Sequence, residues 1–144
     1  LEIKTIKKLL DEESIVLAGG GGGIPVIRGP DGDYEGIPAV IDKDHTSALL
    51  GAELGAKTLI LLTSVPEVFL NFGTDREEKL TKCSQAELIK YNREGHFAEG
   101  SMKPKIEAAI EFLSNGGEKV LITAAETLEE ALDGRRGSWF FSKT

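Results

Sequence analysis

This chain of 144 residues has few of the features that mark secreted, membrane or nucleic-acid-binding proteins. Its only cysteine, Cys83, cannot form an internal disulfide, so a reducing compartment such as the cytoplasm is expected. No apolar run approaches the roughly 18 residues that a membrane helix needs, and no signal peptide is recognisable. Lys and Arg number 17 against 24 Asp and Glu, and the net charge of -7 argues against a broad nucleic-acid-binding surface. We therefore expect neither a membrane nor a nucleic acid as a partner.

The remaining composition is that of one soluble globular domain. Hydrophobic residues make up 40% of the chain and charged residues 28%, which is enough apolar material for an ordinary core. The negative charge still allows a small cationic pocket for a nucleotide. The chain begins at Leu1 without an initiator Met, as expected for a piece of a longer polypeptide or for a processed chain.

Apolar periodicity and turn residues predict alternating helices and strands. Amphipathic or capped segments predict helices over residues 1–11, 43–54, 85–92, 106–113 and 126–132. Short apolar runs predict strands over residues 15–18, 57–63, 119–123 and 138–141, with a small hairpin between residues 25 and 41. The strands at 15–18 and 57–63 are continuously apolar, so we expect them to be buried, the second on both faces. Alternation of this kind predicts an α/β fold, an αβα arrangement around a mostly parallel sheet.

Five consecutive glycines, Gly19 to Gly23, follow the first predicted strand directly. Glycine allows close backbone approach to a ligand, and consecutive N–H groups can bind an anion. The alternative is a flexible turn or linker, although the apolar segments on both sides favour a ligand loop. The run matches neither the Walker motif, since no lysine follows it, nor a dinucleotide fingerprint, since Pro25 denies the required helix.

The triplet Asp42-Lys43-Asp44 stands at an expected strand-to-helix junction, after the apolar Ala39-Val40-Ile41. Unpaired N–H groups and the helix dipole favour an anion at such a position. Lys105 is predicted at another helix N-terminus, just after Pro104. Two cations at helix starts suit phosphoryl transfer, so we expect Lys43 and Lys105 to converge on one site. The alternative for both aspartates is helix capping, with Asp44 accepting N–H bonds from the first turn.

Other residues bear on the place and the chemistry of a site. Thr63 and Ser64 follow the strand at 57–63, and ligands of open α/β sheets bind at the carboxyl ends of strands. His45 and His96 lack the spacing of metal ligands, so no metal site is expected among the side chains. Cys83 has no basic neighbour that would activate it, and Trp139 with the two phenylalanines after it is better explained by packing.

Several of these runs, taken together, resemble carbamate kinase within the amino-acid kinase superfamily. The matching segments occur in the family's order and cover nearly the whole chain: Gly20 to Val26, Ala39 to Asp44, Leu70 to Gly73, Glu94 to Phe97, Gly100 to Met102, Pro104-Lys105 and Asn115 to Gly117. The resemblance implies a three-layer αβα sandwich that transfers phosphoryl between ATP and carbamate with Mg²⁺. It also implies small-molecule substrates, namely carbamate or carbamoyl phosphate and an adenine nucleotide, and a homodimeric parent enzyme.

The resemblance also implies roles for particular residues. Lys43 and Lys105 resemble phosphate-binding lysines and Asp44 an organising aspartate, the three catalytic candidates. Gly20, Gly21, Gly22 and Gly23 resemble the loop beside carbamate and the transferred phosphoryl group. The nucleotide pocket would be lined by Asp42, Thr63, Ser64, Phe69, Asn71, Met102 and Pro104. Ser64 and Pro66 depart from the residues that relatives often carry there.

The family's chain is roughly twice as long as this one, so residues 1–144 resemble its C-terminal, nucleotide-binding half as a single domain. The N-terminal half, with a further lysine and most of the dimer surface, has no counterpart here. We therefore expect this chain to bind ADP or ATP weakly and to catalyse little or nothing by itself. The alternatives are a stand-alone nucleotide-binding or regulatory module without turnover, and another acyl-phosphate-forming kinase such as an acetylglutamate kinase.

Overall fold

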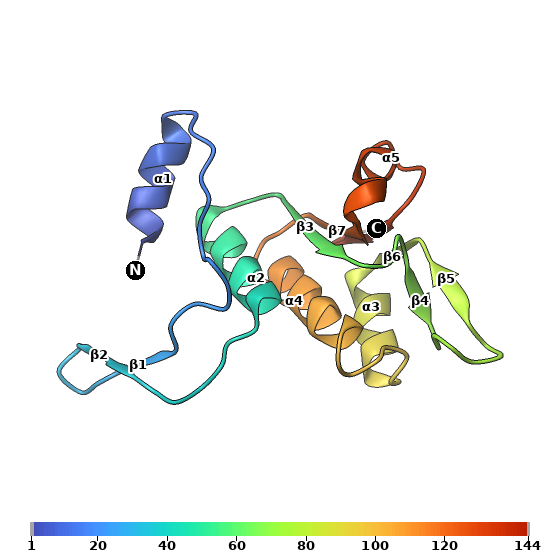
Figure 1. Cartoon of the computed structure of the whole chain (residues 1–144), viewed down its shortest axis with the longest axis horizontal. Coiled ribbons are helices and arrows are strands. Elements are labelled where there is room, and N and C mark those ends of the chain that lie inside the picture. Colours follow the sequence, from blue (N-terminus) through green and yellow to red (C-terminus); the bar gives the residue numbers. More distant parts are fainter. Residues whose placement is uncertain (1, 144) are drawn as a thin grey trace.

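A four-stranded sheet forms the centre of the protein, for which the computed structural model describes residues 2–143 (Figure 1). Its strand order is β3-β7-β8-β6, with bounds β3 Thr58–Thr63, β7 Lys119–Ala124, β8 Ser138–Phe141 and β6 Lys82–Ser84. The β3–β7 and β6–β8 pairs are parallel, as predicted, whereas β7 and β8 run antiparallel. The sheet is therefore largely parallel, with one antiparallel step that the alternation of elements did not predict.

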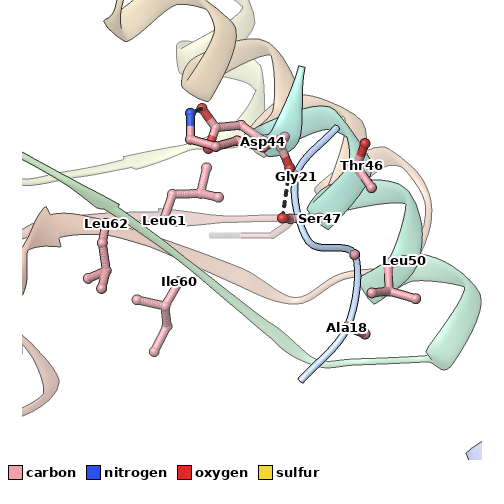
Figure 2. A pocket seen from close by; sticks show the side chains of 11 residues that line it. Ala18, Gly21, Asp44, Thr46, Ser47, Leu50, Ile60, Leu61 and Leu62 are labelled. Atoms are coloured by element: carbon pink, nitrogen blue, oxygen red, sulfur yellow. Dashed lines mark hydrogen bonds and ion pairs between the residues drawn. The ribbon is translucent and has the colours of Figure 1, made fainter. Parts of the chain in front are cut away.

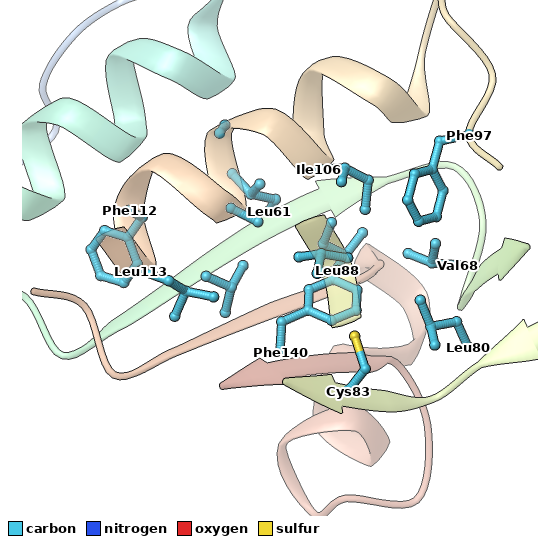
Figure 3. Packing of buried hydrophobic residues seen from close by; sticks show 14 of the residues in the cluster. Leu61, Val68, Leu80, Cys83, Leu88, Phe97, Ile106, Phe112, Leu113 and Phe140 are labelled. Atoms are coloured by element: carbon cyan, nitrogen blue, oxygen red, sulfur yellow. The ribbon is translucent and has the colours of Figure 1, made fainter. Parts of the chain in front are cut away.

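Helices lie on both faces of this sheet, which gives the expected αβα layering (Figure 3). One face is covered by α2 Lys43–Leu54, α3 Gln85–Arg93 and α4 Met102–Ser114. The other face carries the 3-10 turn Ala125–Thr127 and the short helix α5 Leu128–Leu132, where a single α-helix was predicted. The first helix, α1 Ile3–Asp11, contacts α2.

The hydrophobic core fills the space between the sheet and the layer of α2, α3 and α4 (Figure 3). Phe112 and Ile106 of α4, Leu88 of α3 and Phe140 of β8 all belong to this core, and their side chains are fully buried. Burial of each such side chain contributes about 1.5–3 kcal/mol, so this layer holds α4, and with it Lys105, against the sheet.

Two small hairpins project from this body: β1 Val26–Arg28 with β2 Tyr34–Gly36, and β4 Val68–Leu70 with β5 Glu78–Leu80. The first is the predicted hairpin, and the second was expected only as a polar, turn-rich segment. The second hairpin is fastened by the buried hydroxyl of Ser138, which accepts from the Val68 N–H at 2.8 Å and donates to the Leu80 carbonyl at 2.5 Å. One side chain of β8 thus binds both strands of the β4–β5 hairpin.

Two predicted helix-end signals, each formed by residues close together in the sequence, are confirmed. Gly55 ends α2 in the left-handed conformation, with φ of 72°. Ser84 caps α3 by accepting from the Glu87 N–H, and the Glu87 carboxylate accepts from the Ser84 N–H at 2.8 Å, the predicted capping box.

Three predictions about apolar segments are wrong. Residues 15–18 form no strand, and Ile15 and Leu17 are 96% and 98% exposed. Residues 39–41 also lie outside any strand, so α2 follows a loop. Strand β3 is buried on one face only: Leu61 is 4% exposed, but Leu62 on the other face is 48% exposed. The exposure of β3 has a physical cause, because among the described residues it pairs only with β7 and forms the end strand of the sheet.

Candidate functional site

The centre of the candidate site is a buried ion pair between α2 and α4. Lys105 Nζ donates to Asp44 Oδ2 at 2.7 Å, and both side chains are over nine-tenths buried. Lys43 Nζ lies 3.6 Å from the same oxygen, but its side chain is 65% exposed. The expectation that the two lysines share one site is thus met, with Asp44 between them.

The first turn of α2 explains why Asp44 points inward. Asp42, not Asp44, is the N-cap, and its Oδ1 accepts from the Asp44 N–H at 2.7 Å. Asp44 is therefore free to use its own carboxylate for Lys105, close to the positive end of the helix dipole. Helix α4 begins at Met102, four residues before the predicted start at residue 106. Lys105 is therefore the fourth residue of the helix and does not precede it.

The glycine run passes directly over this helix start. Thr46 of α2 donates from its hydroxyl to the Gly22 carbonyl at 2.7 Å. A Cβ built on Gly22 would lie 1.5 Å from the Ile41 carbonyl oxygen, so only glycine fits between this loop and residue 41. Four of the five glycines have positive φ, and Gly22 is the exception. The run is thus a shaped loop packed against α2, which supports the ligand-loop interpretation over a flexible linker.

A cavity of about 290 Å³ lies between the glycine loop, the start of α2 and the outer edge of β3 (Figure 2). Gly19, Gly21, Lys43 and Asp44 form its polar wall. Its apolar wall includes Leu50 of α2 and the three central residues of β3, Ile60, Leu61 and Leu62. Backbone amides, an exposed ammonium group and a helix start together make a suitable environment for a small anion.

The other predicted nucleotide-binding residues do not line this cavity. Met102 and Pro104 belong to the first turn of α4, beside Lys105, and Met102 packs against the core. Thr63 ends β3, and Ser64 follows it as an exposed residue, so both stand at the carboxyl end of a strand as predicted.

Phe69 and Asn71 lie at the β4–β5 hairpin. The Phe69 ring is 6.0 Å from that of Phe72, and Asn71 takes a positive φ of 52° just after β4. Asn71 Oδ1 is 2.8 Å from His96 Nδ1, which joins the hairpin to the loop before α4.

The two histidines make side-chain contacts that their spacing in the sequence did not predict. His45 Nδ1 is 2.8 Å from Glu111 Oε2, an ion pair or hydrogen bond that links α2 to α4 near the cavity. His96 Nε2 lies 3.1 Å from Glu94 Oε2, so both of its ring nitrogens have partners. The His45–Glu111 contact was not predictable from the sequence pattern, because 66 residues separate the two.

The remaining candidate chemistries find little support in the part of the chain that the structure describes. Among residues 2–143 there is no group of three or more His, Cys, Asp or Glu side chains arranged to hold a metal. Burial raises the pKa of the Cys83 thiol to about 12, with the Glu87 charge adding to the effect, so this cysteine is poorly suited to act as a nucleophile. No helix within those residues is long and apolar enough to span a membrane.

The fold and the lysine–aspartate–glycine site fit one class of protein, and residues 1–124 match the Amino acid kinase family. The chain belongs to this family. It is 46% identical over 139 residues to the carbamate kinase of Staphylococcus haemolyticus (strain JCSC1435), covering 96% of this chain and 45% of that protein. It is 44% identical over 138 residues to the carbamate kinase-like protein YahI of Escherichia coli (strain K12), covering 96% of this chain and 44% of that protein.

A solved structure gives the same picture. Carbamate kinase from Giardia lamblia bound to AMP-PNP superimposes with a TM-score of 0.91 at 38% identity, covering 98% of this chain and 44% of that one. The chain thus spans less than half the length of these relatives.

Proposed function

We propose that this chain is the nucleotide-binding portion of an ATP:carbamate phosphotransferase, which interconverts carbamoyl phosphate and ADP with carbamate and ATP. The observation that carries the proposal is the buried Lys105–Asp44 pair beside an exposed Lys43 and a shaped glycine loop. Similarity to named carbamate kinases, one of them with AMP-PNP bound, supports the choice of substrates.

The chemistry asked of these residues is positioning and charge neutralisation. A phosphoryl group in transfer carries negative charge on its oxygens, and fixed cations and amides stabilise that charge most when they need no reorganisation. Asp44 holds the Lys105 ammonium in one place, so that Lys105 is a fixed donor. Lys43, whose side chain is mostly exposed, remains able to move onto a phosphate. The amides of the glycine loop would supply further donors on the same polar wall of the cavity.

Met102, Pro104, Phe69, Asn71, Thr63 and Ser64 remain proposed contacts of the nucleotide, and Asp42 reaches it only if it leaves its capping bond. Mg²⁺ commonly binds through substrate phosphates and one or two carboxylates rather than in an all-protein cage. The cavity offers one carboxylate for that mode, the side chain of Asp44. Mg²⁺ would then enter with the nucleotide and help neutralise its phosphates.

We further propose that the uncovered side of β3 receives the N-terminal half of a longer parent chain. Ile60 and Leu62 are exposed there beside the cavity, and within residues 2–143 no strand pairs with the outer edge of β3. The stretch of residues 15–18 forms no helix or strand, exposes Ile15 and Leu17, and reaches the same cavity at Ala18. An acceptor substrate bound between the halves would meet the phosphoryl group at the glycine loop.

Two measurements test the proposed function. Calorimetric titration of this chain with AMP-PNP and Mg²⁺ should show weak binding that Lys43→Ala reduces and Lys57→Ala leaves unchanged. Lys57 is a fair control because it is an exposed lysine in a salt bridge with Glu118. Equal binding by both variants would remove Lys43 from the site.

The second measurement is a coupled assay of ATP formation from carbamoyl phosphate and ADP. We expect turnover by the longer parent and little or none by this chain alone. Lys105→Ala in the parent should abolish turnover while circular dichroism shows a folded protein. A parent that binds nucleotide without turnover would favour the alternative of a regulatory module.

A further inference from the structure

A second and larger cavity, of about 580 Å³, lies on the face of the sheet that carries α5. It is bounded by β5, β6 and β8, the start of β7 and the turn after α5; Figure 1 shows the C-terminal end of the chain in this region. It shares no lining residue with the glycine-loop cavity. Its volume falls in the range of roughly 300–1,000 Å³ that is typical of small-molecule sites.

The charge of this cavity is opposite to that of the chain. Five of its 13 lining residues are basic, against 17 of 144 in the whole sequence: Lys79, Lys82, Lys119, Arg135 and Arg136. Only two lining residues are acidic, Glu67 and Asp133. A protein of net charge -7 thus concentrates positive potential in one concave place, which attracts anions.

The two carboxylates are already engaged. Buried Glu67 lies 2.7 Å from Arg136 Nε and 3.6 Å from Lys79 Nζ, and Asp133 lies 2.9 Å from Arg135. The buried Arg136 Nε still lacks a well-aligned hydrogen bond despite its short distance to Glu67.

Lys82 and Lys119 have no carboxylate within salt-bridge distance among residues 2–143. Instead, the Lys82 ammonium lies 5.0 Å above the Phe141 ring and the Lys119 ammonium 5.5 Å above the Trp139 ring. The two rings stack on each other with centroids 6.2 Å apart. The aromatic pair therefore holds two ammonium groups at the cavity without neutralising them, so that both remain available to an anion.

We infer that this cavity binds a small molecule with two or more negative charges, phosphate- or carboxylate-based. Guanidinium and ammonium groups bind both kinds of anion through charge-assisted hydrogen bonds, and five cations facing two occupied carboxylates leave an excess of positive charge. The site is separate from the proposed phosphoryl-transfer site and does not depend on that function.

Trp139 makes this inference directly measurable, because it is the only tryptophan in the chain and lines the cavity. Its fluorescence should change saturably as inorganic pyrophosphate is added at constant ionic strength, and should not change with KCl. A parallel titration with citrate distinguishes the ligand classes: a response to both indicates a general oligoanion site, and a response to one assigns its chemistry. A change that is absent, or that rises linearly without saturation, overturns the inference and leaves Lys82 as an edge-strand lysine that discourages aggregation.

Matched variants locate the binding. Lys82→Gln and Lys119→Gln, both at exposed positions, should each weaken pyrophosphate binding about tenfold. The single variant Lys4→Gln on α1 removes the same charge from an exposed position elsewhere and should leave the affinity unchanged. Lys43→Ala should also leave it unchanged, which separates this site from the glycine-loop cavity. Equal weakening by the α1 variant would show unspecific attraction, and loss of the response in Lys43→Ala would place the anion in the other cavity; either result overturns the inference.

Discussion

Replacement of Lys105 by methionine tests whether the Lys105–Asp44 pair is a structural as well as a functional element. At 2.7 Å and an effective dielectric constant of about 20, the Coulomb attraction is about 6 kcal/mol before the cost of removing both charges from water. The Lys43–Asp44 attraction, at 3.6 Å with Lys43 mostly in water, is only about 1 kcal/mol. Lys105→Met therefore leaves a buried carboxylate with a weak partner.

Breaking one side of a buried pair costs about 3–5 kcal/mol, and Lys43 can recover at most part of that, so we expect Lys105→Met to lower the free energy of unfolding by about 3 kcal/mol. Since a domain of this kind is stable by only about 5–15 kcal/mol, the loss is a large share of the total. Urea unfolding followed by circular dichroism measures it. Lys43→Met is the control and should cost under about 1 kcal/mol.

Adding Asp44→Asn to Lys105→Met completes a double-mutant cycle and isolates the interaction of the two charges. The double variant should be more stable than the sum of the two single losses predicts, because neither charge is then left without its partner. If Lys105→Met costs no more than Lys43→Met, or if the two losses simply add, the reasoning about a buried and coupled pair is wrong.

Gly22→Ala should displace the glycine loop and weaken AMP-PNP binding, because its Cβ would meet the Ile41 carbonyl; Gly36→Ala, with nothing within 4 Å, is the calorimetric control. Ser84→Ala should lower stability by about 1 kcal/mol in urea unfolding through loss of the α3 cap. Hydrogen bonds from the Ser84 backbone and hydroxyl lower the pKa of Glu87 below 4.5. The stabilisation by the Glu87 carboxylate is therefore present above pH 4.5 and lost as the pH falls through the folded-state pKa. NMR titration should show the pKa of Glu87 rising toward 4.5 in Ser84→Ala. Cys83, with its pKa raised to about 12, should resist iodoacetamide at about pH 8 in the folded protein and react once urea exposes it; rapid labelling of the folded chain would contradict its burial.

The sequence predicted best those features whose causes lie within a few residues. The C-terminal stop at Gly55 and the capping box of Ser84 and Glu87 depend only on local backbone chemistry, and both appear as predicted. The convergence of Lys43 and Lys105 was also predictable, since parallel crossover units bring their helix starts to one side of the sheet.

Features that depend on distant partners were not predictable from the pattern. Apolar content predicted burial of residues 15–18 and of both faces of β3, but burial requires another element, and the described chain supplies none there. The second cavity, with its basic residues and aromatic pair, is lined by residues from β5, β6, β7 and β8. In the sequence each of its lysines is therefore indistinguishable from a solvated surface charge. The Asp44 capping alternative failed because Asp42 occupies that role and leaves Asp44 to Lys105.

The Ser138 hydroxyl has a consequence for the order in which this chain can acquire its final shape. It bonds Val68 and Leu80, which lie 70 and 58 residues earlier in the chain, yet it belongs to a strand that ends at Phe141. The β4–β5 hairpin is also held by the Asn71–His96 bond and by its buried apolar side chains, but both bonds to Ser138 form only when these last residues join the sheet. Detachment of the C-terminal strand should therefore free the Val68 amide, so that it exchanges with solvent deuterium at the rate at which the end of the chain opens.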